Sequence, residues 1–108
     1  MTHVDKFGVG NVVAFALEYL KGRPLHCSYD IDAVDPTEAP ATGTVVRGGL
    51  TFREAHFIAE ELGACGQLGS MDLVEVNPML LRGNSDASRQ TAELGAALIA
   101  SCMGSSII

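Results

Sequence analysis

Two aspartates two positions apart are the residues whose types and spacing most favour chemistry. Asp30 and Asp32 end a stretch in which apolar and polar side chains alternate, as they do in a strand. In an extended chain both carboxylates point to one side, roughly 6–7 Å apart. They repel each other at that distance, and a bound hard cation such as Mg²⁺, Ca²⁺ or Mn²⁺ removes the repulsion. The alternative is a solvated acidic loop end, in which Asp35 forms a turn before Pro36.

Glu75 is the second candidate, because it is the last acid of a nearly continuous apolar stretch over residues 68–76. The ends of parallel strands open onto the same edge of a sheet, where α/β proteins bind ligands. We therefore expect Glu75 to converge with Asp30 and Asp32. The alternative is that Glu75 forms an ion pair with one of three arginines, Arg47, Arg53 or Arg82.

Other polar residues favour structural roles. Asp72 lies inside an apolar stretch, where an unpaired charge is costly, so we predict that it has a partner, such as an arginine from elsewhere in a larger fold. His26 shares the predicted face of Asp30 but lies about 13 Å down the strand, which favours a core or inter-helix histidine over a metal ligand. Ser28 lacks the G-x-S-x-G turn of a nucleophilic serine. The loop glycines are followed by no G-K-[ST], so they predict close backbone approach rather than a phosphate loop.

The elements that must position these residues alternate between helix and strand. We predict helices over residues 2–21, from Thr51 to about residue 63, and from Asn84 or Ser85 to Gly104. Strands are predicted over residues 25–32 and 68–76, with a functional loop over 33–50. Thr51 and Glu54 form a capping box. A helix between two strands predicts a βαβ unit with a parallel sheet that is covered on both faces.

Composition excludes several classes of function. The chain has 108 residues, enough for one domain or part of one, and 47% of them are hydrophobic, which excludes a disordered chain. Its net charge is −6 and it has no Lys/Arg cluster, which excludes a nucleic-acid or anionic-membrane partner. No apolar run reaches about 18 residues, and no secretory signal is visible. Three widely spaced cysteines indicate reduced thiols and a cytoplasmic location.

Four segments together resemble the ureohydrolases, and arginases more than agmatinases. They are SYDIDAVDP at residues 28–36, APATGT at 39–44, GGLT at 48–51 and DLVEVNP at 72–78. The first segment is a specific family signature, and the likeness extends from Met1 to Cys102. The resemblance implies an α/β fold, namely the C-terminal portion of a parallel-sheet, three-layer α/β/α arginase-like domain.

The resemblance also implies an activity and the residues that carry it. The family hydrolyses a guanidinium group to urea with two Mn²⁺ ions, and arginases convert L-arginine to L-ornithine. By position, Asp30 would bridge both metals and Asp32 would bind one. Glu75 would accept the substrate guanidinium, and Thr44 would line the pocket. The family's members form homo-oligomers.

The sequence departs from the family in one large respect. Its upstream Gly-Gly-Asp-His and Asp-Ala-His-x-Asp ligand segments are not in these 108 residues. Two octahedral ions need about twelve donor positions, and Asp30 and Asp32 offer at most four oxygens. We therefore expect the chain alone to be inactive. Two strands with three helices also leave uncovered edges and apolar faces, so we expect the chain to be aggregation-prone, oligomeric or dependent on the missing N-terminal part. Two alternatives stay open: an agmatinase-like amidinohydrolase, and a non-catalytic module that associates with full-length subunits. A smaller departure is Val45, where arginases usually have proline.

Overall fold

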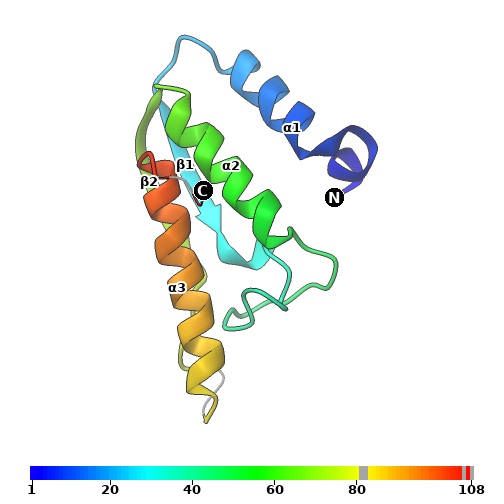
Figure 1. Ribbon diagram of the computed structural model, residues 1–108, viewed down its shortest axis with the longest axis vertical. Coiled ribbons are helices and arrows are strands. Elements are labelled where there is room, and N and C mark those ends of the chain that lie inside the picture. Colours follow the sequence, from blue (N-terminus) through cyan, green and yellow to red (C-terminus); the bar gives the residue numbers. More distant parts are fainter. Residues whose placement is uncertain (81–82, 106, 108) are drawn as a thin grey trace.

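A parallel two-stranded sheet packed against helices forms the framework of the chain (Figure 1). The computed structural model describes residues 1–80, 83–105 and 107. In chain order the elements are α1 (Thr2–Tyr19), β1 (Leu25–Asp30), the 3₁₀ helix η1 (Ile31–Ala33), α2 (Phe52–Ala64), β2 (Leu68–Val74) and α3 (Ser85–Cys102). β1 and β2 pair in parallel, which confirms the predicted βαβ unit.

The core lies between one face of the sheet and the helices α2 and α3. Tyr29 of β1 is buried there, and its hydroxyl donates to Ala55 O of α2 at 3.0 Å. Leu94 and Leu98 of α3 are buried in the same cluster. This packing orients β1, so that the end of the strand is held by contacts with α2.

The opposite face of the sheet is exposed, which corrects the prediction that both faces are covered. His26 and Asp72 point to this face and are 52% and 50% exposed. α1 does not cross to it within the described residues, because it packs against α2 instead (Figure 1). The period-2 alternation of β1 therefore marks one buried and one exposed face in this chain.

α1 is the element that differs most from its prediction. Gly8 has φ 79° and ψ 151°, so that it breaks the helix into two helical segments. The helix begins at Thr2 as predicted, with Met1 as an N-cap that makes no side-chain hydrogen bond, and it ends at Tyr19 rather than at residue 21. No residue of α1 is fully buried, and Phe15 is exposed.

The other two helices begin where their caps predict. The Thr51 hydroxyl accepts from Glu54 N at 3.2 Å, and Glu54 Oε2 accepts from Thr51 N at 2.9 Å. Asn84 is the N-cap of α3, and its side chain accepts from Ala87 N at 3.1 Å. Side-chain caps satisfy backbone donors that the helix leaves free, which makes these starts readable from the sequence.

Both strands end two residues earlier than predicted. β1 stops at Asp30 and not at position 32, because the Asp30 side chain accepts from Asp32 N and turns the chain into η1. β2 stops at Val74 and not at Val76, because Glu75 adopts φ 71°. In both cases the residue that ends the strand, Asp30 or Glu75, is a predicted site residue.

Candidate functional site

Asp30 and Asp32 lie together at the carboxyl end of β1, but in a turn rather than on an extended strand. Asp30 Oδ1 accepts from Asp32 N at 3.0 Å, and both residues are half-buried. The predicted strand spacing of their carboxylates is therefore wrong, whereas their proximity is confirmed. The pKa of Asp32 is raised, first by burial, then by the charge and hydrogen bonding of Asp30, and also by the charge of Glu75.

Glu75 joins these aspartates at the same edge of the sheet. Asp30 pairs in register with Val74, so that Glu75 directly follows the position opposite Asp30. Its charge acts on Asp32, so that Glu75 lies near that aspartate, but among the described residues the three carboxylates are not placed as one group that could hold a metal ion. Glu75 is exposed and forms no ion pair among the described residues, so Arg47 and Arg53 are not its partners. Arg82 lies outside the described residues.

The backbone of Glu75 is strained. It is the one non-glycine residue with positive φ in the part of the chain that the structure describes. This left-handed conformation costs a bulky residue of order 1–3 kcal/mol and persists only when the surroundings hold it. Such strain gathers at sites where a side chain must point in a particular direction.

The loop between η1 and α2 is tied to both strand ends. Val34 forms a bridge with Leu50, and Thr42 forms an antiparallel bridge with Val76, next to Glu75. Asn77 N donates to Ala41 O at 2.9 Å. Thr44 follows shortly after Thr42 and is exposed. The structure therefore brings the predicted substrate residues, Thr44 and Glu75, onto neighbouring segments.

Asp35 organises the base of this loop. Its carboxylate accepts from Thr37 N at 2.9 Å, Gly48 N at 2.9 Å and Gly49 N at 3.2 Å. These donors, with Thr37 first, hold the pKa of Asp35 below its ordinary value. The predicted turn role of Asp35 is confirmed. Gly48 has φ 82°, and a Cβ on Gly49 would lie 2.6 Å from Asp35 N, which confirms the glycines' predicted function there.

A polar network on the exposed sheet face corrects two further predictions. Ser28 Oγ donates to Asp72 Oδ1 at 2.6 Å, and His26 Nε2 lies 3.2 Å from Asp72 Oδ2. His26 Nδ1 lies 2.8 Å from Ser70 Oγ. Among the described residues, the partners of Asp72 are thus Ser28 and His26 rather than an arginine, and His26 lies exposed on the sheet face rather than in the core. The hydrogen bond from Ser28 has the largest effect and lowers the pKa of Asp72; burial opposes it, and the hydrogen bond and charge of His26 lower the pKa further.

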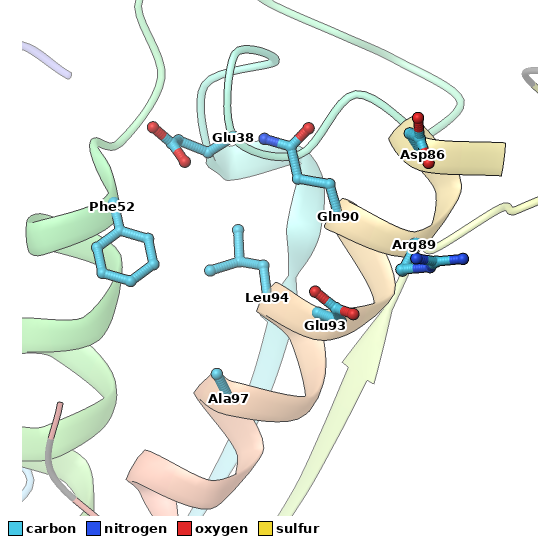
Figure 2. A pocket seen from close by; sticks show the side chains of 8 residues that line it. All are labelled: Glu38, Phe52, Asp86, Arg89, Gln90, Glu93, Leu94 and Ala97. Atoms are coloured by element: carbon cyan, nitrogen blue, oxygen red, sulfur yellow. The ribbon is translucent and has the colours of Figure 1, made fainter. Parts of the chain in front are cut away.

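Two hollows in the surface help to locate the site. One of about 260 Å³ is lined by Asp32 together with loop residues that include Val46 and Gly48. A larger one of about 330 Å³ lies between α3, the start of α2 and the loop residue Glu38 (Figure 2). None of the predicted site residues lines this second hollow, whereas Asp32 lines the first.

The carboxylates fit part of a metal site. Asp30 and Asp32 offer the hard oxygen donors that Mn²⁺ and Mg²⁺ prefer. Within residues 1–80, 83–105 and 107, no group of three or more His, Cys, Asp or Glu side chains is placed to hold a metal ion. The donor set of the described residues is therefore incomplete, and further donors are needed.

Among the residues that the structure describes, no helix is long and apolar enough to span a bilayer.

Comparison with known proteins gives one consistent family. The profile of the arginase family matches residues 1–104. An arginase of Schizosaccharomyces pombe is 46% identical over all of this chain, which covers 34% of that protein. The crystal structure of Bacillus subtilis arginase superposes with a TM-score of 0.86 at 35% identity, over 97% of this chain and 38% of that one.

A third relative was solved with a bound amino acid. The crystal structure of Entamoeba histolytica arginase in complex with L-ornithine has a TM-score of 0.82 at 27% identity, over 94% of this chain and 33% of that one. The chain spans about a third of the length of the curated relatives it matches.

Proposed function

This chain belongs to the arginase family, and we propose on that basis that the protein hydrolyses L-arginine to L-ornithine and urea at a manganese site. One observation carries the proposal: Asp30, Asp32 and Glu75 gather at the carboxyl edge of the parallel sheet. The three come from two strand ends that lie side by side, at the edge where α/β folds bind their ligands.

Asp30 and Asp32 are the residues proposed to hold manganese. Their negative charges already act on each other, since the pKa of Asp32 is raised in part by Asp30. A cation bound by both side chains offsets this repulsion. Manganese ions, when bound, supply a water activated for attack at neutral pH.

Glu75 is proposed to accept the guanidinium group of the substrate. A carboxylate matches this planar cation through two parallel charge-assisted hydrogen bonds. The positive φ of Glu75 supports this role, because backbone strain of this kind gathers at binding and active sites. Thr44, on the neighbouring loop segment, is proposed to line the same pocket.

The described residues are proposed to supply one part of the complete active site. Two ions need about twelve donor positions, far more than Asp30 and Asp32 provide. The rest of the ligand set would come from residues beyond those described, so the 108-residue chain by itself is expected to release no urea. We further propose a homo-oligomer in the cytoplasm.

The test is urea release by the full-length protein loaded with Mn²⁺. We expect L-arginine to be hydrolysed, and Asp30→Ala and Asp32→Ala to lose both bound manganese and most of the activity. Asp86→Ala is the matched control, because Asp86 is an exposed aspartate at the start of α3. Wild-type manganese content in both site variants would refute the assignment of the ligands.

Substrate choice is tested in the same assay. Agmatine differs from L-arginine in lacking the α-carboxylate, so that comparing the two separates an arginase from an agmatinase-like enzyme. Preference for agmatine would refute the proposed substrate while leaving the guanidinium chemistry intact. No turnover of either substrate, with folded and manganese-loaded protein, would favour the non-catalytic module.

A further inference from the structure

A buried hydroxyl on α3 connects that helix to the loop at the candidate site. Thr91 is 0% exposed, and its Oγ1 accepts from Ala41 N at 2.9 Å. The same hydroxyl donates to Ala87 O, also at 2.9 Å, within its own helix. The hydroxyl therefore donates one hydrogen bond and accepts another, which together fix its orientation.

From Ala41 the connection continues to the end of β2. Ala41 O accepts from Asn77 N at 2.9 Å, and Thr42 bridges to Val76. These contacts tie the loop to the residues directly after Glu75. Thr44 follows on the same loop. The Thr91 hydroxyl is therefore connected, through Ala41, to the segments that carry both proposed substrate residues.

This connection explains how the strained residue is held. Glu75 keeps φ 71° only if its neighbours are fixed, and the pairing of residues 41–42 with 76–77 fixes them. The loop half of the pairing is buried, since Ala41 is 0% and Thr42 is 4% exposed, whereas Val76 is half-buried and Asn77 is exposed. Without the Thr91 hydroxyl, the Ala41 amide would be left unpaired in the interior, which favours movement of the loop.

We propose that Thr91 is a positioning residue for guanidinium binding, which acts through Ala41 to hold Glu75 and Thr44 in place. Thr91 is fully buried and so acts without touching the substrate. The inference rests on the proposed function, because it assigns Glu75 and Thr44 to the substrate. It adds a residue on another element that no motif of the candidate site contains.

The test compares three variants in the full-length, Mn²⁺-loaded protein. Thr91→Val keeps the shape but removes the hydroxyl, and Thr91→Ser keeps the hydroxyl. Ser101→Ala is the control, because Ser101 is another buried hydroxyl residue on α3. We measure KM and kcat for L-arginine, manganese content, and hydrogen exchange of the Ala41 and Asn77 amides.

Thr91→Val is expected to raise KM about tenfold, the size of one lost buried hydrogen bond, with unchanged manganese content. The Ala41 and Asn77 amides should exchange about tenfold faster. Thr91→Ser and Ser101→Ala should stay within about twofold of the wild-type protein in both measurements.

Three results would overturn the inference or separate it from the proposed function. Unchanged exchange in Thr91→Val would show that the hydroxyl does not hold the loop. Faster exchange with unchanged KM would reduce Thr91 to a structural role and overturn its positioning role. A wild-type protein that hydrolyses no guanidino substrate would refute the proposed function, and the exchange measurement would still decide whether Thr91 holds the loop.

A second variant covers the case in which Thr91→Val does not fold. Thr91→Cys keeps a weak donor and acceptor in place of the hydroxyl. Its KM and its Ala41 exchange should both lie above those of Thr91→Ser. Values equal to those of Thr91→Ser would contradict the proposal.

Discussion

Replacing Gly49 with alanine tests how the loop supports the candidate metal ligands. A Cβ at this position would lie 2.6 Å from Asp35 N, 2.8 Å from Ala33 O and 2.8 Å from Val34 C. All three are backbone atoms, so no side chain can rotate away. Either the loop or the segment that follows Asp32 must shift.

The expected magnitude follows from these contacts. Forcing an extra methyl group into a packed site costs about 1–3 kcal/mol. Two backbone hydrogen bonds join the same segments, Asp35 N to Leu50 O at 2.9 Å and Leu50 N to Ala33 O at 2.8 Å. Losing one of them adds about 0.5–1.5 kcal/mol, for a total of roughly 1.5–4.5 kcal/mol. Because Ala33 directly follows Asp32, manganese affinity should fall as well.

The assay is chemical denaturation of the full-length protein, with manganese affinity measured in parallel. Gly43→Ala is the matched control, since no atom lies within 4 Å of its Cβ position and its φ is not positive. We expect the control to stay within about 0.5 kcal/mol of the wild-type protein. Equal stability of Gly49→Ala and Gly43→Ala would refute the argument from close approach.

Two further predictions concern individual carboxylates. The pKa of Asp35 is lowered in the folded state, so its contribution to stability is present above the unfolded value near 3.9 and is lost as the pH falls through the folded value. Acid titration should therefore show Asp35→Asn less stable than wild type at neutral pH, with the gap closing below about pH 4; a constant gap would contradict this. Glu75→Gln should retain manganese but raise KM for L-arginine about 10–100-fold, as expected when a charge-assisted pair is lost. Unchanged kinetics would exclude Glu75 as the guanidinium acceptor.

Local sequence signals predicted the helices that carry their own caps. The Thr51–Glu54 box and the Asn84 cap place the starts of α2 and α3 correctly, because the capping contacts are made within a few residues. α1 has no side-chain cap, and Gly8 interrupts it. A glycine within a helical pattern is compatible with either a continuous or a broken helix, so that the break could not be read from the pattern.

The strand ends show a different limit. Alternation predicted that Asp30 and Asp32 share a face, but the Asp30 side chain competes for the Asp32 amide and ends the strand. The sequence therefore predicts which carboxylates meet, because parallel strands end at one edge. It does not predict how they meet, because this depends on a single turn.

Contacts between distant segments were beyond any local pattern. Ser28 donates a hydrogen bond to Asp72 because the two residues are opposite each other in the β1–β2 register. That register depends on how the crossover helix α2 packs. Thr91 looks in the sequence like one more small residue in an amphipathic helix. Only the fold places its hydroxyl against Ala41.

The strain at Glu75 links these observations into one account of the site. A glutamate in the left-handed region is unfavourable by itself, so the sequence gives no reason to expect it there. The conformation persists because the Ala41–Asn77 pairing holds the following residues, and Thr91 holds Ala41 in turn. The direction of the proposed guanidinium acceptor is thus set by a helix that contributes no ligand. Substitutions in that helix should therefore change substrate affinity more than manganese binding. The reason is that the proposed manganese ligands, Asp30 and Asp32, lie on β1 and η1, beside the loop base that Asp35 holds.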